Sequence, residues 1–164
     1  EAEKIIFAPD QNLGDYVAQR SDKEIILWEG YCPTHHRVQL KDIKRAKEVH
    51  PQGVVMVHPE CRPEVVRAAD FVGSTAQMTD YARTSKADTI IVGTEMGLLY
   101  KLQEQSPNKK FYILNQGLVC QNMKMTSLSE IALALQEMQY EVTVTEEIRE
   151  KAKLALEKML ELSS

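Results

Sequence analysis

Short, largely apolar runs alternate with amphipathic segments along most of this chain. The runs predict β-strands over 5–8, 25–28, 54–57, 70–73, 89–93 and 111–114. The segments between them have helical spacing, and Ile43, Ala46 and Val49 are one example. Two further helices are predicted near the C-terminus, over 128–140 and 146–162. The order is therefore β-α-β-α, repeated.

The predicted strands are apolar throughout and do not alternate apolar with polar positions. Strands of this kind are covered on both faces, which is typical of parallel sheets. The sequence therefore predicts the α/β class, as small parallel-sheet αβα sandwich domains followed by a C-terminal helical segment.

Composition narrows the classes of protein that remain. The 164 residues are 43% hydrophobic and 27% charged, with a net charge of −4. This mildly acidic balance favours no nucleic-acid partner. No apolar run approaches the roughly 18 residues of a membrane span, and the first residues do not resemble a signal peptide. The three cysteines, an odd number far apart in the sequence, favour an intracellular, cytoplasmic protein with reduced or metal-bound sulfur.

Polar residues follow several of the predicted strands directly. His58 and Glu60 come after one strand, Ser74 and Thr75 after another, and Thr94 after a third. Ligands of open α/β sheets bind at the carboxyl ends of the strands, so these residues should lie along one edge. His58 and Glu60 are a candidate acid–base pair. Helix capping is the simpler interpretation of the hydroxyl residues, although they could also bind an anionic metabolite.

The segment "GYCPTHH" places Cys32, His35 and His36 in one predicted loop. A partial zinc site is one interpretation, and a thiol nucleophile activated by a histidine is another. These alternatives lead to a zinc or thiol hydrolase that uses Cys32 and His36, or to a small module that binds an anionic metabolite. Cys120 also lies beyond a strand end, which is an unusual place for a packing thiol. Cys61 has the position of a structural residue.

The strings "FAPDQNLGDYVA", "GYCPTHH", "VVMVHPECRPEV", "ADFVGSTAQM", "IIVGTEMGLLYKL" and "LVCQNMKM" occur in an order and at a spacing that resemble quinolinate synthase. The resemblance extends over essentially the whole chain. It implies a three-domain fold and an enzyme of NAD biosynthesis, a transferase that condenses iminoaspartate with dihydroxyacetone phosphate to quinolinate. It also implies a [4Fe–4S] cluster held by three cysteines, one from each domain, with the fourth iron open to substrate.

Matched to the family motifs, Cys32 and Cys120 are implied to be two of the three cluster ligands. His58 and Glu60 are implied to be catalytic and to contact substrate. Ser74 and Thr75 are implied to bind substrate carboxylates or phosphate. Cys61 is not expected to be a ligand, and the resemblance does not rank His35 against His36.

The first cluster ligand of the family pattern has no counterpart here, and about the first 130 residues of that pattern are absent. We therefore expect the end of a preceding α/β domain over 1–30, an α/β domain over 31–122 and C-terminal helices over 123–164. A chain with two of three ligands is expected to be inactive alone and to need the missing N-terminal half as its partner.

Overall fold

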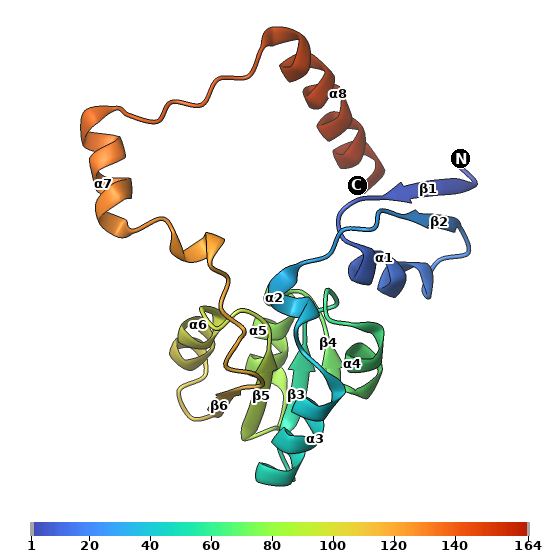
Figure 1. The fold of residues 1–164 in the computed structure, drawn as a ribbon, viewed down its shortest axis with the longest axis vertical. Helices are drawn as coiled ribbons and strands as arrows, with labels where there is room; N and C mark the ends of the chain where they lie inside the picture. Colours follow the sequence, from blue (N-terminus) through green and yellow to red (C-terminus); the bar gives the residue numbers. More distant parts are fainter. Residues whose placement is uncertain (1, 164) are drawn as a thin grey trace. The chain divides into compact units, whose positions relative to one another are not determined.

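The computed structural model of the chain describes residues 2–163 (Figure 1). It divides into two compact parts, one that ends at Cys120 and one that begins at Gln121. Each part is described by itself below. The predicted three-part division at residues 30 and 122 stays a prediction.

A parallel sheet of four strands is the centre of the first part. The strands run in the order β4 (Phe71–Val72), β3 (Val54–Val57), β5 (Thr89–Gly93) and β6 (Lys110–Ile113). Every neighbouring pair in this sheet is parallel. The predicted α/β class and parallel sheet are therefore confirmed.

Helices cover both faces of this sheet, as its strand composition predicted. They are α3 (Leu40–Val49) and α4 (Pro63–Ala68) on one face, and α5 (Thr75–Thr84) and α6 (Leu98–Gln105) on the other. Val55 and Val57 of β3 are buried in the cluster under α3 and α4, whereas Met56 between them is buried in the cluster under α5 and α6. The buried positions of the central strands β3 and β5 are apolar, so polar chemistry gathers at the strand ends.

A second parallel sheet pairs β1 (Lys4–Phe7) with β2 (Glu24–Leu27), and α1 (Gln11–Ala18) connects them. The strands themselves confirm the prediction, but their expected burial does not hold. Ile6 is 78% exposed and Ile26 is 46% exposed. Two strands and one helix offer too little surface to cover both faces, and an isolated pair of strands is only marginally stable. This sheet therefore needs further packing partners.

The sequence predicted a loop over the whole "GYCPTHH" segment, but the structure differs from this prediction. Its second half forms a single helical turn, α2 (Pro33–His36), with Cys32 at the N-cap. Proline is favourable at the first helical position because its fixed φ suits the helix and its missing N–H would have no helical partner there. The turn directs the side chains of Cys32 and His35 toward one another, as described below.

The second part contains a 3₁₀ turn (Asn122–Lys124), α7 (Leu128–Glu137) and α8 (Glu146–Ser163). A capping box begins α7 at Ser127, and a left-handed residue, Met138, ends it earlier than predicted. Neither helix has a buried residue in this structure. None of the helices within residues 2–163 combines the length and apolarity that crossing a membrane requires.

Candidate functional site

The candidate site lies at the carboxyl ends of β3 and β5. The chain passes from β3 to β4 on one side and then returns to β5 on the other side of β3. Such a reversal is the topological switch point at which open α/β sheets bind ligands. At this point the backbone N–H of His58 donates to the carbonyl of Gly93 over 3.1 Å. The residues that follow the two strands are therefore held side by side.

Cys32, His35 and Glu60 converge at this edge. Nδ1 of His35 lies 2.9 Å from Oε2 of Glu60 and 3.2 Å from Sγ of Cys32. Cys32 and His35 come from the start and the third residue of α2, whereas Glu60 comes from the loop after β3. Two segments distant in sequence thus supply a thiol, an imidazole and a carboxylate to one point.

The ring of His35 is fixed on two sides. Its Nε2 lies 2.9 Å from Oγ1 of Thr94, and its face stacks on the ring of His58 with 4.6 Å between centroids. Both His35 and Thr94 are buried. Of the two adjacent histidines that the sequence left unranked, His35 is therefore the one beside Cys32.

His36 has a different set of neighbours. Its Nδ1 lies 3.1 Å from Nδ2 of Asn12, and its ring stacks on Tyr31 with a centroid separation of 4.0 Å. The structure thus pairs Cys32 with His35 and not with His36, which removes the geometric basis of a Cys32–His36 hydrolase.

The surroundings set the charge of each group in this cluster. The hydrogen bond with His35 is the largest cause that lowers the pKa of Glu60, so this carboxyl is ionised at neutral pH. Burial is the main cause that lowers the pKa of His58, which keeps its ring neutral. Burial also raises the pKa of the Cys32 thiol. This group of side chains can therefore accept a proton at Glu60 and donate a hydrogen bond from the neutral ring of His58.

The tautomer of His58 follows from one contact. Its Nδ1 accepts the backbone N–H of Glu60 over 3.3 Å, so the ring proton belongs on Nε2. The same ring lies close to the carboxylate, with 3.7 Å between its Nδ1 and Oε2 of Glu60. A neutral histidine with an Nε2–H donor therefore stands next to a carboxylate, as an acid–base arrangement requires.

Cys120 lies at the same edge of the sheet, where its backbone contacts Glu95, the residue after Thr94. Its backbone N–H donates to Oε1 of Glu95 over 3.4 Å, and its side chain is half-buried. Thr94 contacts His35, and His35 contacts Cys32. Both predicted cluster ligands therefore adjoin the carboxyl end of β5.

Cys61 is different from the other two cysteines. Its side chain is fully buried in the core under α3 and α4, and its Sγ lies 3.6 Å from the carbonyl oxygen of Gly93. Burial raises its pKa to about 12. A thiol in this setting is a packing residue, since thiolates are the ligands and nucleophiles.

We predict that a thiol-alkylating reagent modifies Cys32 and Cys120 in the folded chain and leaves Cys61 unmodified. The half-buried thiols are accessible to reagent, whereas Cys61 has neither exposure nor thiolate character. Mass spectrometry of digested protein checks this, with labelling in urea as the control that reaches every cysteine. Labelling of Cys61 in folded protein as fast as that of Cys120 would contradict the assignment.

Ser74 and Thr75 lie at the carboxyl end of β4, next to β3. Ser74 is the N-cap of α5 and forms a capping box with Gln77, and Thr75 is the first residue of the helix. Both side chains are exposed, and their described contacts do not join the Cys32–His35–Glu60 cluster. Capping is thus observed for Ser74, while an exposed helix N-terminus stays available to an anion.

We predict that Ser74→Ala lowers the free energy of unfolding by about 1 kcal/mol through loss of the cap, and that Ser74→Asp restores it. Urea unfolding followed by circular dichroism checks both variants. An unchanged stability for Ser74→Ala would show that the capping box contributes nothing. If Ser74 also binds an anionic substrate, Ser74→Asp should remain stable and yet bind that substrate less well.

Two residues that the sequence analysis did not single out hold the backbone of Cys32 and of Glu60 in place. The carboxylate of Asp10 caps α1 by accepting the N–H of Leu13 over 2.7 Å, and it accepts the N–H of Cys32 over 2.9 Å. Nδ2 of Asn12 donates to the carbonyl of Glu60 over 3.0 Å. Asp10 was detectable in principle, because it follows β1 at a strand end; the long-range contacts of Asn12 leave no mark in the sequence.

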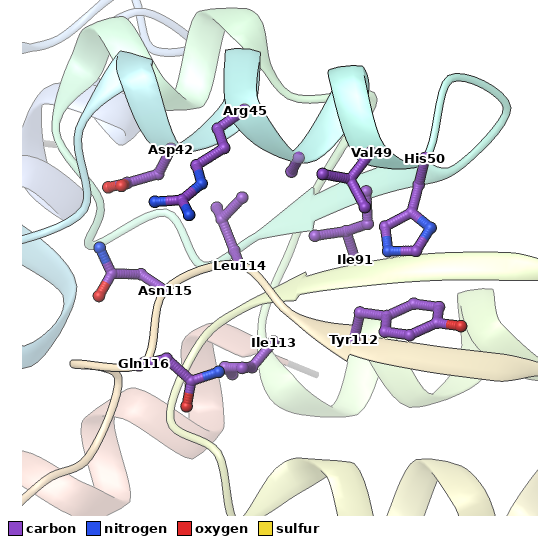
Figure 2. Close-up of a pocket in the computed structure, with 11 residues that line it drawn as sticks. Asp42, Arg45, Val49, His50, Ile91, Tyr112, Ile113, Leu114, Asn115 and Gln116 are labelled. Carbon is purple, nitrogen blue, oxygen red and sulfur yellow. The ribbon is translucent and has the colours of Figure 1, made fainter.

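Two pockets of the first part lie away from these three residues. One of about 500 Å³ opens between α3 and the edge strand β6, where side chains of the helix and the strand face each other (Figure 2). His50 and Tyr112 stack within it at 4.1 Å. A second of about 340 Å³ lies between α1 and the start of α4 and includes His36. Neither is lined by Cys32, His35 or Glu60.

Comparisons with known proteins identify the family of the chain. The family model described as "Quinolinate synthetase A protein" matches residues 1–161. The chain is 54% identical over 161 residues to the quinolinate synthase of Caldicellulosiruptor bescii, covering 98% of this chain and 53% of that protein. It is 48% identical over 160 residues to the quinolinate synthase of Methanosarcina barkeri, covering 98% of this chain and 53% of that protein.

The chain spans about half the length of the curated relatives it matches. The match to the family model is nearly continuous along the chain and includes both strand ends that form the site. The chain therefore belongs to the quinolinate synthetase A protein family.

Proposed function

We propose that this chain supplies part of a quinolinate synthase active site. The reaction condenses iminoaspartate with dihydroxyacetone phosphate, forms the pyridine ring of quinolinate and releases phosphate and water. The observation that carries the proposal is the convergence of Cys32, His35 and Glu60, with His58 stacked on His35, at the switch point of the sheet. The three free cysteines suit the cytoplasmic location that belongs to this proposal.

The cysteines of the chain suit two of the three ligands of a [4Fe–4S] cluster. Cys32 and Cys120 are half-buried at one edge, which is a setting for thiolate ligands, whereas Cys61 is sealed in the core. Since the sequence holds three cysteines in all, the third thiolate has to come from outside these 164 residues. When bound, a cluster with one open iron supplies a Lewis acid for a substrate oxygen or carboxylate.

Glu60 and His58 are proposed to move protons during enolisation and ring closure. Ionised Glu60 accepts a proton from substrate carbon or nitrogen, and neutral His58 presents its Nε2–H to a developing oxyanion or a departing hydroxyl. His35 holds the Glu60 carboxylate in place through their 2.9 Å contact. These roles place the proton-moving groups beside Cys32, where the cluster would lie.

Ser74 and Thr75 are proposed to bind the phosphate or a carboxylate of substrate. They begin α5 at the strand next to β3, so the helix N-terminus opens toward the same edge as His58. Backbone N–H groups at such a terminus favour an anion. Both substrates and the product are anionic, which makes this position useful at several stages of the reaction.

The test of the proposal is turnover by a joined chain. We define the joined chain as these 164 residues fused to the part of the C. bescii relative that they do not match. After anaerobic reconstitution with iron and sulfide, it should convert iminoaspartate and dihydroxyacetone phosphate to quinolinate, measured by chromatography. The 164-residue chain treated in the same way should form none. Turnover by the 164-residue chain alone, or by neither protein while the relative itself is active, would overturn the proposal.

A further inference from the structure

We propose that Cys32, His35 and Glu60 also form a site for a single zinc ion. Their ligand atoms, a sulfur, a ring nitrogen and a carboxylate oxygen, all lie within 4.8 Å of one another. The site lies in the described part of the chain and needs no residue from elsewhere. Zinc binding therefore does not rest on the proposed iron–sulfur function.

The spacing of the ligand atoms is close to that around tetrahedral zinc. Bonds of about 2.3 Å to sulfur and about 2.0–2.1 Å to nitrogen or oxygen give ligand-to-ligand distances of roughly 3.4–3.6 Å. Nδ1 of His35 lies 3.2 Å from the Cys32 sulfur and 2.9 Å from the Glu60 oxygen. For these two pairs the ion has to push the atoms apart by only a few tenths of an ångström. The Cys32 sulfur and the Glu60 oxygen lie within 4.8 Å of each other, so side-chain torsions can adjust their separation to the tetrahedral value.

The surroundings orient each ligand as metal sites require. Histidine ligands usually donate their second ring N–H to an acceptor, which fixes the tautomer that exposes the binding nitrogen. In the metal-free site Nδ1 of His35 carries the proton that contacts Glu60. When the ion binds, the ring proton can reside on Nε2, which lies 2.9 Å from Oγ1 of Thr94, and leave the Nδ1 lone pair for the ion. Asp10 fixes the backbone of Cys32, and Asn12 fixes the carbonyl of Glu60.

The donor set selects the kind of ion. A thiolate, a neutral imidazole and a carboxylate carry two negative charges in all, which a divalent ion balances. One sulfur donor favours zinc over magnesium or calcium, which prefer oxygen ligands. Three protein ligands leave the fourth tetrahedral position for water or another ligand. The two segments that meet here also avoid the strain of taking every ligand from one tight turn.

Cys32 cannot serve zinc and an iron–sulfur cluster through the same lone pair in the same geometry. Zinc bound here and the cluster of the proposed function are therefore alternative states of this edge. It follows that zinc added first should slow iron uptake by the joined chain, and that a chelator should reverse the effect.

The test uses the 164-residue chain, stripped of metal with a chelator and titrated with zinc. We expect one zinc per chain, with Cys32→Ala, His35→Ala and Glu60→Gln each weakening binding more than about tenfold and Thr94→Val weakening it about 10- to 100-fold. His36→Ala, Glu64→Gln and Cys120→Ala are matched controls and should bind as the unaltered chain does. Circular dichroism of each variant confirms that it is folded.

Cobalt binding gives a second readout that reports directly on the sulfur ligand, so it distinguishes loss of a ligand from loss of structure. Co²⁺ in this site should produce a thiolate-to-cobalt charge-transfer band that Cys32→Ala abolishes and Cys120→Ala preserves. Absence of stoichiometric zinc would overturn the inference. It would also be overturned if Cys120→Ala and Cys32→Ala lost zinc affinity equally. Because no iron or sulfide is present, failure here leaves the proposed enzyme function untouched, and success does not depend on it.

Discussion

Cys32→Ala or Cys120→Ala in the joined chain should reduce reconstituted iron from about four atoms per chain to a small fraction of that value. Each of these thiols adjoins the carboxyl end of β5, and each is half-buried and accessible to a ligand. Cys61 is sealed in the core and cannot substitute. Iron and acid-labile sulfide, assayed after anaerobic desalting, are the measurements.

The matched control for these variants is Cys61→Ala, which should keep iron near the level of the unaltered protein. That variant leaves a small void in the core, so a modest loss of stability is expected without loss of the cluster. Equal iron loss in all three variants would refute the ligand assignment, because it would show that any cysteine change destabilises the cluster alike.

Glu60→Gln should lower quinolinate formation by the joined chain by about 100- to 10,000-fold and leave its iron content unchanged. The amide keeps the shape of the side chain but removes the charge that accepts a proton from substrate. It also weakens the contact with Nδ1 of His35, which the carboxylate makes over 2.9 Å. The turnover number, compared at equal iron content, is the quantity to measure.

Glu64→Gln is the control for this change, because Glu64 is an exposed carboxylate in the first turn of α4, four residues from Glu60. It should retain full turnover. Retained turnover in Glu60→Gln would remove Glu60 from the acid–base role. A loss of iron in that variant would instead assign Glu60 to the support of Cys32.

The sequence predicted most of the fold because its strands are short, apolar and covered on both faces. Val54–Val57 and Thr89–Gly93 have the predicted bounds, and each of the other strands differs from its predicted bounds by one residue at each end. The parallel arrangement followed from the alternating order of strands and helices and from strands that are apolar at every position. His58 and Glu60 are predicted at the same edge as the other residues that follow strands, since parallel strands end together.

Three features lay beyond what local sequence can specify. The helical turn at Pro33–His36 has four residues, too few for a periodic signal. The choice of His35 over His36 depends on Thr94 and Glu60, which are distant in sequence. The exposure of Ile6 reflects how much chain is available to cover it, which the apolar pattern of its strand does not record.

The most direct test of this account is the metal content of one reconstituted sample of the joined chain, with iron, sulfide and zinc determined together and the cluster followed by electron paramagnetic resonance. We expect about four iron and four sulfide per chain, with a reducible cluster signal that Cys32→Ala eliminates. A sample that holds no sulfide and less than one iron per chain after reconstitution in excess iron would contradict the iron–sulfur assignment, even if zinc were bound at Cys32.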